Sequence, residues 1–94
     1  MNKYELLYIL AAGSEDNINS NIEKYKNLVE KNGGSVEKID RWGIKRFAYP
    51  INFKNEGYYV LMNFEADGKL IAEIDRQMRI NDDVYRQMFT RLEE

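Results

Sequence analysis

Three pairs of neighbouring carboxylates are the residues of this sequence most able to act as an acid, a base or a metal ligand. They are Glu15-Asp16, Asp82-Asp83 and Glu93-Glu94. Each pair also has a structural explanation, since the first suits the opening turn of a helix, the second a helix-to-strand turn and the third the chain end. We therefore predict that none of the three pairs is catalytic.

Histidine and cysteine are both absent from the 94 residues. Their absence excludes thiol nucleophiles, zinc sites built on thiolate or imidazole, and the usual general base near neutral pH. We predict that the protein is not an enzyme, that it needs no cofactor and no metal, and that it has no small-molecule substrate.

Two glycine-containing segments are candidates for binding a phosphate group, and both are poor ones. Gly33-Gly34 follows a predicted helix, so the helix N-terminus that would receive the anion is missing, and a helix C-cap is the better interpretation. The loop from Ala11 to Ser14 has no cation, although an enzyme of the acylphosphatase type needs positive charge at the phosphoryl group.

Cations and aromatic residues are interleaved in the stretch RWGIKRFAYPIN, residues 41–52. The cations are Arg41, Lys45 and Arg46, and the aromatic residues are Trp42, Phe47 and Tyr49. Such a mixture suits a phosphate backbone and unstacked bases, but an exposed edge strand with solvated charges explains it equally well. The apolar segment from Phe47 to Phe53 is longer than a solvated edge needs and predicts a protein interface.

The segment EGYYVLMNF, residues 56–64, is a poor match to the signature of an RNA recognition motif. Glu56 stands where that signature has a base, and Tyr59 stands where it has a small residue. Ordinary strand alternation explains the segment better, with one set of side chains facing the helices.

The spacing of apolar residues predicts the elements that would position these side chains. Residues 4–10 predict a central strand that is buried on most of both faces. Ser14 is the predicted N-cap of a helix that ends near Asn32, and Gly33-Gly34 supplies a residue that accepts the left-handed conformation after it. The later elements are an edge strand from Ser35 or Val36 with a bend or bulge at Gly43, a polar turn at 54–57, a central strand at 58–64, a helix opening at Asp67-Gly68, a turn at 81–83 and a strand at 84–92.

This order predicts an α+β fold of the ferredoxin-like split β-α-β type (βαββαβ), a four-stranded antiparallel sheet with two helices on one face. Residues 1–94 are predicted to form a single domain. The predicted core consists of Leu6, Leu10, Ile18, Ile22, Val29, Val60, Ile74 and Met78, with Ile71 in the buried stripe of the second helix and Leu70 beside it.

Charge and hydropathy limit the partners and the compartment. The formal net charge is −2, which argues against a general nucleic-acid binder, because phosphate affinity comes from clustered Lys and Arg. The mean hydropathy is −0.66 and no apolar run approaches the roughly 20 residues that cross a bilayer. We predict a cytoplasmic protein without a membrane partner.

The segment GIKRFAYPIN, residues 43–52, closely resembles the signature of the bacterial small-subunit ribosomal protein six family. Tyr4-Glu5, Gly57-Tyr58 and the segment MRINDDVYRQM at 78–88 are similar to the same family, so the resemblance covers essentially the whole chain. Two features depart from it: Phe47 stands where the family usually has leucine, and the chain stops at Glu94 without the longer tail of many members.

The resemblance implies a structural constituent of the small (30S) ribosomal subunit that binds the central domain of 16S rRNA with ribosomal protein eighteen as a heterodimer. A strongly basic partner would explain the acidic balance, because it supplies most of the phosphate neutralisation. The isolated chain is expected to be monomeric. The alternative is a free-standing ferredoxin-like RNA-binding or regulatory domain outside the ribosome.

The expected contacts follow from the resemblance together with the predicted topology. Strand 84–92 should neighbour the first strand, so Lys3 and Tyr4 are expected to join Arg86 in one basic and aromatic patch. The expected RNA-binding residues are Lys3, Tyr4, Lys45, Arg46, Arg79 and Arg86, and the expected partner-binding residues are Phe47, Tyr49, Pro50 and Ile51. Pairing of Arg79 and Arg86 with Asp75, Asp82 or Asp83 is the competing explanation for those two cations.

Overall fold

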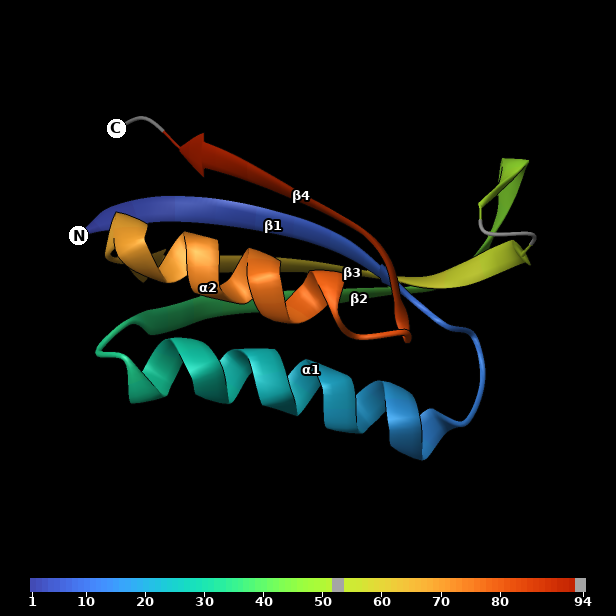
Figure 1. The fold of residues 1–94 in the computed structure, drawn as a ribbon, viewed down its shortest axis with the longest axis horizontal. Coiled ribbons are helices and arrows are strands. Elements are labelled where there is room, and N and C mark those ends of the chain that lie inside the picture. The colour runs from blue at the N-terminus through green and yellow to red at the C-terminus, as the bar shows by residue number, and fades with distance from the viewer. Residues whose placement is uncertain (52–53, 93–94) are drawn as a thin grey trace.

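The computed structural model describes residues 1–51 and 54–92, with Ile51 described by its backbone alone. Its elements are β1 (Asn2–Leu10), α1 (Glu15–Lys31), β2 (Ser35–Ile51), β3 (Lys54–Ala66), α2 (Gly68–Arg79) and β4 (Val84–Leu92) (Figure 1). Asn52, Phe53 and the pair Glu93-Glu94, about which the sequence made predictions, lie outside the described residues.

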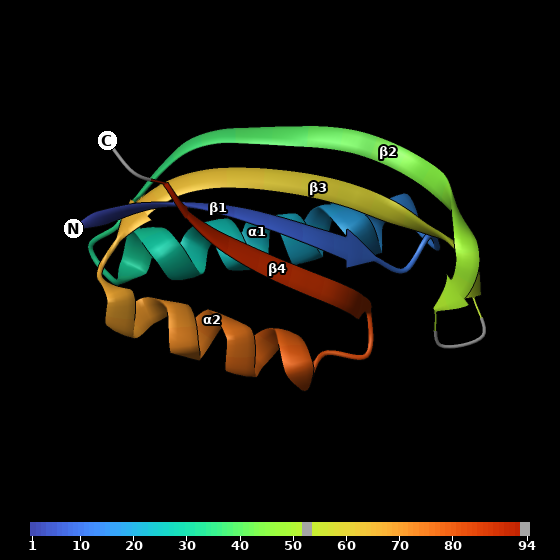
Figure 2. The same ribbon diagram turned by 90° about the horizontal axis from the view of Figure 1, so that it is seen from above.

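The predicted fold is confirmed. The four strands form one sheet in the order β2-β3-β1-β4, and each neighbouring pair is antiparallel (Figure 2). Both helices lie against the same face of that sheet, and no helix of the described residues covers the opposite face (Figure 1). We call this opposite face the open face; it consists of the outward-pointing side chains of all four strands.

The two faces of β1 differ in burial, which corrects the prediction that both are mostly buried. Tyr4, Leu6, Tyr8 and Leu10 face the helices and are all buried. On the open face Lys3, Glu5 and Leu7 are only partly buried, because no helix covers them. Ile9 is the exception on that face, with 7 % of its surface exposed.

The first helix begins and ends where its capping residues predict. The Ser14 hydroxyl accepts a hydrogen bond from the backbone N–H of Asn17 at 3.4 Å, and Glu15 and Asp16 occupy the first turn, where the helix dipole favours negative charge. Gly33, beyond the C-cap Asn32, has φ of +83°. Glycine reaches that left-handed conformation without the steric penalty of a Cβ.

The predicted core is confirmed, because all eight of its residues are buried in one cluster between the sheet and the helices. Tyr8 and Tyr25 are buried there as well, with their rings 5.8 Å apart in an edge-on arrangement. In α2 the buried residues are Leu70, Ile74 and Met78, whereas Ile71 is only partly buried. Leu70 therefore takes the position in the stripe that the sequence assigned to Ile71.

The predicted polar turn at residues 54–57 is wrong, because β3 already begins at Lys54. Gly57 pairs with Lys45 and Glu56 pairs with Arg46, so β2 and β3 continue as a two-stranded ribbon past the last residue of β1 (Figure 1). The bulge predicted at Gly43 is confirmed by its φ of +86° and by the shift of register between Arg41 and Gly43. Polar residues are tolerated in this ribbon since both of its faces are accessible to solvent.

Neither helix in the described part of the chain is long and apolar enough to cross a membrane.

Candidate nucleic-acid and protein interface

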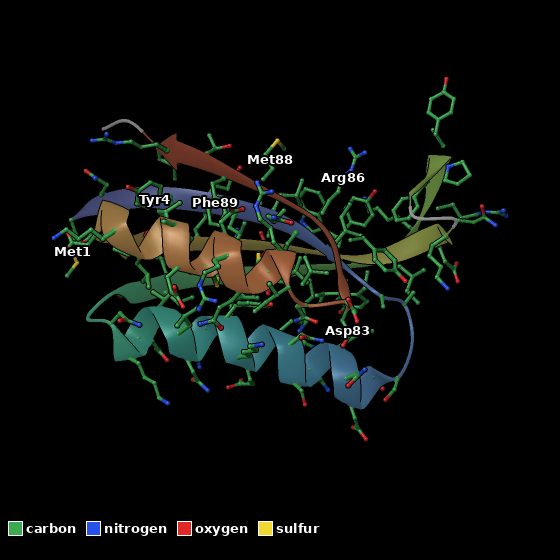
Figure 3. All side chains as sticks on the ribbon, in the orientation of Figure 1. Met1, Tyr4, Asp83, Arg86, Met88 and Phe89 are labelled. Carbon is green, nitrogen blue, oxygen red and sulfur yellow. The ribbon has the colours of Figure 1, made fainter. Side chains whose placement is uncertain are left out.

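The open face has an apolar and aromatic centre built by strand alternation. Ile9 pairs with Tyr59 on β3 and with Arg86 on β4, so these three side chains form one row across the sheet. Two residues further along, Leu7 pairs with Leu61 and Met88 and forms a second row. Arg86 and Met88 project away from the helices, whereas Phe89 points to the helix side (Figure 3).

Three aromatic side chains meet on this face, and we call them the aromatic cluster: Trp42, Phe47 and Tyr59. The Trp42 and Tyr59 rings are stacked, with centroids 6.4 Å apart and an interplanar angle of 13°. The Phe47 ring is tilted against Tyr59 at 6.2 Å. Trp42 is the extra residue of the bulge between Arg41 and Gly43, and the adjoining Gly43 is the strand partner of Tyr59. The bulge thus directs an additional aromatic ring onto the open face.

Cations stand on both sides of the aromatic cluster. The Lys45 ammonium lies 5.1 Å from the centre of the Trp42 ring and 6.0 Å from that of Tyr59, a cation–π geometry. Arg86 stands on the other side of Ile9, and within residues 1–51 and 54–92 it forms no ion pair. The arrangement offers planar surfaces and positive charge together, as a phosphate backbone with unstacked bases requires.

The expected grouping of Lys3 and Tyr4 with Arg86 is not present. Lys3 lies on the open face but is six residues from Ile9, the β1 partner of Arg86, which is about 20 Å along an extended strand. It also forms an ion pair with Glu37 at 3.8 Å. Lys3 and Arg86 therefore belong to two separate parts of the face.

Tyr4 points the opposite way from Lys3, because neighbouring side chains of a strand alternate between faces. Its ring is 8 % exposed and packs 5.7 Å from Phe64 in the core, between β1 and α2 (Figure 3). A base needs an accessible ring to stack on, so the expectation that Tyr4 provides one is corrected.

Lys45 and Arg46 also point to opposite faces. Lys45 pairs with Gly57 and Arg46 with Glu56, so the register is regular between them and their side chains alternate. Arg46 therefore lies on the helix side of the ribbon, away from the aromatic cluster. The basic pair that looks continuous in the sequence is split by the sheet.

Arg79 ends α2 and is engaged in an ion pair. Its guanidinium donates to Asp75 at 2.7 Å, and the Gln87 amide donates to the same carboxylate at 3.0 Å. The hydrogen bonds from Gln87 and Arg79 hold the pKa of Asp75 below its usual range. The pairing with Asp75 that competed with an RNA contact is thus present, although such exposed pairs contribute under about 1 kcal/mol.

The expected partner-binding residues lie on the ribbon and differ in exposure. Tyr49 is 83 % exposed and Pro50 is also exposed. Phe47 is partly buried against its own sheet, where its ring covers Gly57. Of Ile51 only the backbone is described. Tyr49 is therefore the member of this group with the most surface to offer another molecule.

In the pair Asp82-Asp83, the carboxylate of Asp83 is held by side-chain hydrogen bonds from α1. The Asp83 carboxylate accepts hydrogen bonds from the side-chain amides of Asn17 at 3.4 Å and Asn21 at 3.2 Å. The Asn81 amide donates to Asn21 and to the Tyr25 hydroxyl, both at 2.9 Å. These bonds fasten the turn before β4 to α1. In the parts of the chain that the structure describes, no cluster of carboxylates is arranged to hold a metal ion.

The sequence indicated Trp42 and Tyr59 separately and did not predict that they lie together. Tyr59 was interpreted as one member of an alternating strand, and Trp42 as part of the basic and aromatic stretch 41–52. The signal that joins them is the bulge at Gly43, which pairs with Tyr59 and leaves the neighbouring Trp42 unpaired, so that the Trp42 ring stacks on Tyr59. A glycine within a strand indicates that a bulge is present, but the partner residue depends on register.

Comparison with known proteins extends the resemblance seen in the sequence. The profile of the family described as ribosomal protein S6 matches residues 3–91. The small ribosomal subunit protein bS6 of Clostridium acetobutylicum is 47 % identical over 94 residues, covering 99 % of both chains. The bS6 protein of Carboxydothermus hydrogenoformans is 47 % identical over 92 residues, covering 97 % of this chain and 96 % of the relative.

A solved structure agrees with these sequence matches. The crystal structure of 30S ribosomal protein S6 from Thermotoga maritima superposes with a TM-score of 0.87 at 29 % identity. The match covers 97 % of this chain and 87 % of that one.

Proposed function

The chain belongs to the ribosomal protein S6 family, and we propose that it binds 16S rRNA in the small subunit together with ribosomal protein eighteen, as a heterodimer. As a family member it is a structural small-subunit ribosomal protein of the cytoplasmic ribosome and not an enzyme. The rRNA contact, the protein partner and the residues that make both contacts are the proposal.

The single observation that carries the RNA contact is the pair of cations around the aromatic cluster. Arg86 has no competing carboxylate within ion-pair distance in the described chain, and Lys45 is held over two rings. A phosphate that approaches these cations leaves the adjoining sugar or base within reach of planar side chains. We therefore assign Lys45 and Arg86 to the rRNA contact.

The net charge supports a shared rather than an independent contact. A chain of formal charge −2 neutralises few phosphates by itself, and the electrostatic part of the affinity for a nucleic acid grows with the number of phosphates that are neutralised. A basic protein bound beside the open face supplies the missing positive charge. The isolated chain is then a weak RNA binder that becomes a strong one in the heterodimer.

The ribbon is the proposed contact for ribosomal protein eighteen. Tyr49 and Pro50 are exposed there, and an exposed tyrosine is a common anchor of protein interfaces because it combines a large apolar ring with a hydroxyl. Phe47 and Ile51 belong to the same proposed contact. Phe47 already packs on Tyr59, so it supports the ribbon as well as facing the partner.

Salt titration of the complex with rRNA and ribosomal protein eighteen tests the RNA contact. Replacing Arg86 by Gln should lower the salt dependence of binding by about one charge unit, because one phosphate contact is lost. Arg86→Lys should retain the slope. Lys69→Gln is the matched control, since Lys69 is exposed on α2 and far from the open face.

Arg79→Gln separates the two roles considered for that residue. A reduced slope would show that Arg79 leaves Asp75 to contact RNA, whereas an unchanged slope would show that its part is the ion pair. The proposal for Arg86 fails if Arg86→Gln and Lys69→Gln give the same slope as the unchanged protein while both still bind ribosomal protein eighteen.

A further inference from the structure

A pocket of about 670 Å³ lies at the end of the sheet, on the helix side of the ribbon and apart from the aromatic cluster. Three segments far apart in the sequence form it: residues 11–13 after β1, the ribbon residues 46 and 54–56, and Tyr85 at the start of β4. Its volume lies within the range of roughly 300–1,000 Å³ that is usual for sites of small ligands.

The pocket carries an excess of positive charge. Arg46 comes from one strand of the ribbon and Lys54 from the other, and Glu56 is the single carboxylate among the lining residues. Glu56 is the direct strand partner of Arg46. Even so, neither cation is engaged in an ion pair with any residue of the described ranges. Both therefore remain available to an anionic group that enters the pocket.

A second and independent feature directs a ring toward the same place. On β1, Ile9 pairs with Arg86 and Leu10 pairs with Val84, so Tyr85 is the extra residue of a β-bulge. Bulges turn a side chain away from the regular alternation of a strand, and they are frequent beside functional sites. Here the bulge makes Tyr85 line the pocket, where its ring is partly exposed. Ala11 and Ala12 add a small apolar surface next to it.

We propose that this pocket binds one unpaired nucleotide of the rRNA, which is extruded from its neighbours. Arg46 and Lys54 hold the phosphate, the Tyr85 ring stacks on the base, and the amide of Asn55, which also lines the pocket, hydrogen-bonds with the base edge. Cations next to one accessible aromatic ring and an amide are the groups that recognise a splayed-out nucleotide. An acidic peptide would use the cations and leave the ring without a planar partner. The proposal rests on the proposed rRNA function and gives it a specific contact.

Solution NMR of the full chain, titrated with uridine 5′-monophosphate, tests the pocket directly. We expect weak binding that shifts the backbone signals of Ala12, Gly13 and Tyr85. Inorganic phosphate and uridine, titrated separately, should each bind at least about fivefold more weakly than the nucleotide, because each keeps only part of the contact.

Two variants distinguish the contribution of the stacking ring from that of the two cations. Tyr85→Leu should weaken the nucleotide at least about fivefold and leave phosphate unchanged, since it removes only the stacking ring. The double variant Arg46→Gln/Lys54→Gln should weaken both ligands. Lys69→Gln is the control, because Lys69 is exposed on α2 and does not line the pocket. This variant should bind all three ligands as the unchanged protein does.

Several results would overturn the proposal. Equal affinity for phosphate and nucleotide would make the pocket an anion site only. Shifts confined to Trp42 and Tyr59 would place the base on the open face. Tighter binding of a Glu-rich peptide than of the nucleotide would assign the pocket to a protein. The proposed rRNA contact of Arg86 is tested by a different result. It is contradicted if Arg86→Gln leaves the salt slope of the rRNA complex unchanged, even where the nucleotide still binds in the pocket.

Discussion

Gly57 occupies a place in the ribbon that no larger residue fits, and Gly57→Ala is therefore expected to destabilise the protein. A Cβ at this position would lie 2.5 Å from Cγ2 of Ile9 and 2.8 Å from Cζ of Phe47. Both distances are shorter than carbon atoms tolerate, so a neighbour has to move. The positive φ angles among the described glycines belong to Gly33 and Gly43, so the expected effect at Gly57 is purely steric.

The magnitude follows from which neighbour can move. Ile9 is 7 % exposed and is held between β3 and β4, so it has little freedom. Phe47 is only partly buried and can swing toward solvent, which loses its packing on Tyr59. Overpacking of this kind costs about 1–3 kcal/mol, and alanine offsets about 0.4–1 kcal/mol of that by restricting the unfolded chain. We expect a net loss of about 1–2 kcal/mol.

Urea unfolding followed by far-ultraviolet circular dichroism measures this loss. The midpoint should fall without a change in slope, and each kcal/mol should lower Tm by about 4–8 °C in a domain of this size. Gly13→Ala is the matched control, because a Cβ at Gly13 meets no atom within 4 Å. That variant should be as stable as the unchanged protein or slightly more stable.

A double-mutant cycle identifies the clash. Combining Gly57→Ala with Phe47→Ala removes one of the two colliding groups, so the pair should cost at least about 0.5 kcal/mol less than the sum of the single variants. The reasoning is refuted if Gly57→Ala matches Gly13→Ala in stability. It is also refuted if the two changes add without coupling, since Phe47 would then not be the neighbour that gives way.

Three further predictions concern the core, the ribbon and the surface. Ile74→Ala should cost about 2–5 kcal/mol in the same unfolding assay, because Ile74 is fully buried, and a loss below about 0.5 kcal/mol would contradict the packing of α2. Tyr49→Ala should change stability by less than about 0.5 kcal/mol but weaken the complex with ribosomal protein eighteen in calorimetry; an equal loss in folding and binding would instead make Tyr49 a core residue. Hydrogen bonds from Arg76 and Gln77 lower the pKa of Glu73 from 4.5 to about 2, so this carboxylate should add stability above pH 4.5 that is lost as the pH falls toward 2. NMR titration should show that pKa rising toward 4.5 in Arg76→Gln, and an unchanged value would exclude the pairing.

The sequence alone determined the elements and the topology class, because the signals for both are local. The stripe of Ile18, Ile22 and Val29 repeats at helical spacing, and the Ser14 cap and the Gly33-Gly34 pair fix the ends of that helix within a few residues of chain. The signature around Gly43 to Asn52 is local as well, and it was sufficient to indicate the family that the comparisons then established.

The position of the proposed site was decided by the tertiary structure. Whether Tyr4 points to the core or to solvent, and whether Lys45 and Arg46 share a face, depends on the pairing register of the strands, since a shift of one residue reverses every side chain. The bulges at Trp42 and Tyr85 shift that register locally and direct these two side chains to their places. A bulge is a relation between two strands that are distant in the chain, so the residues of one strand do not specify what its side chains will meet.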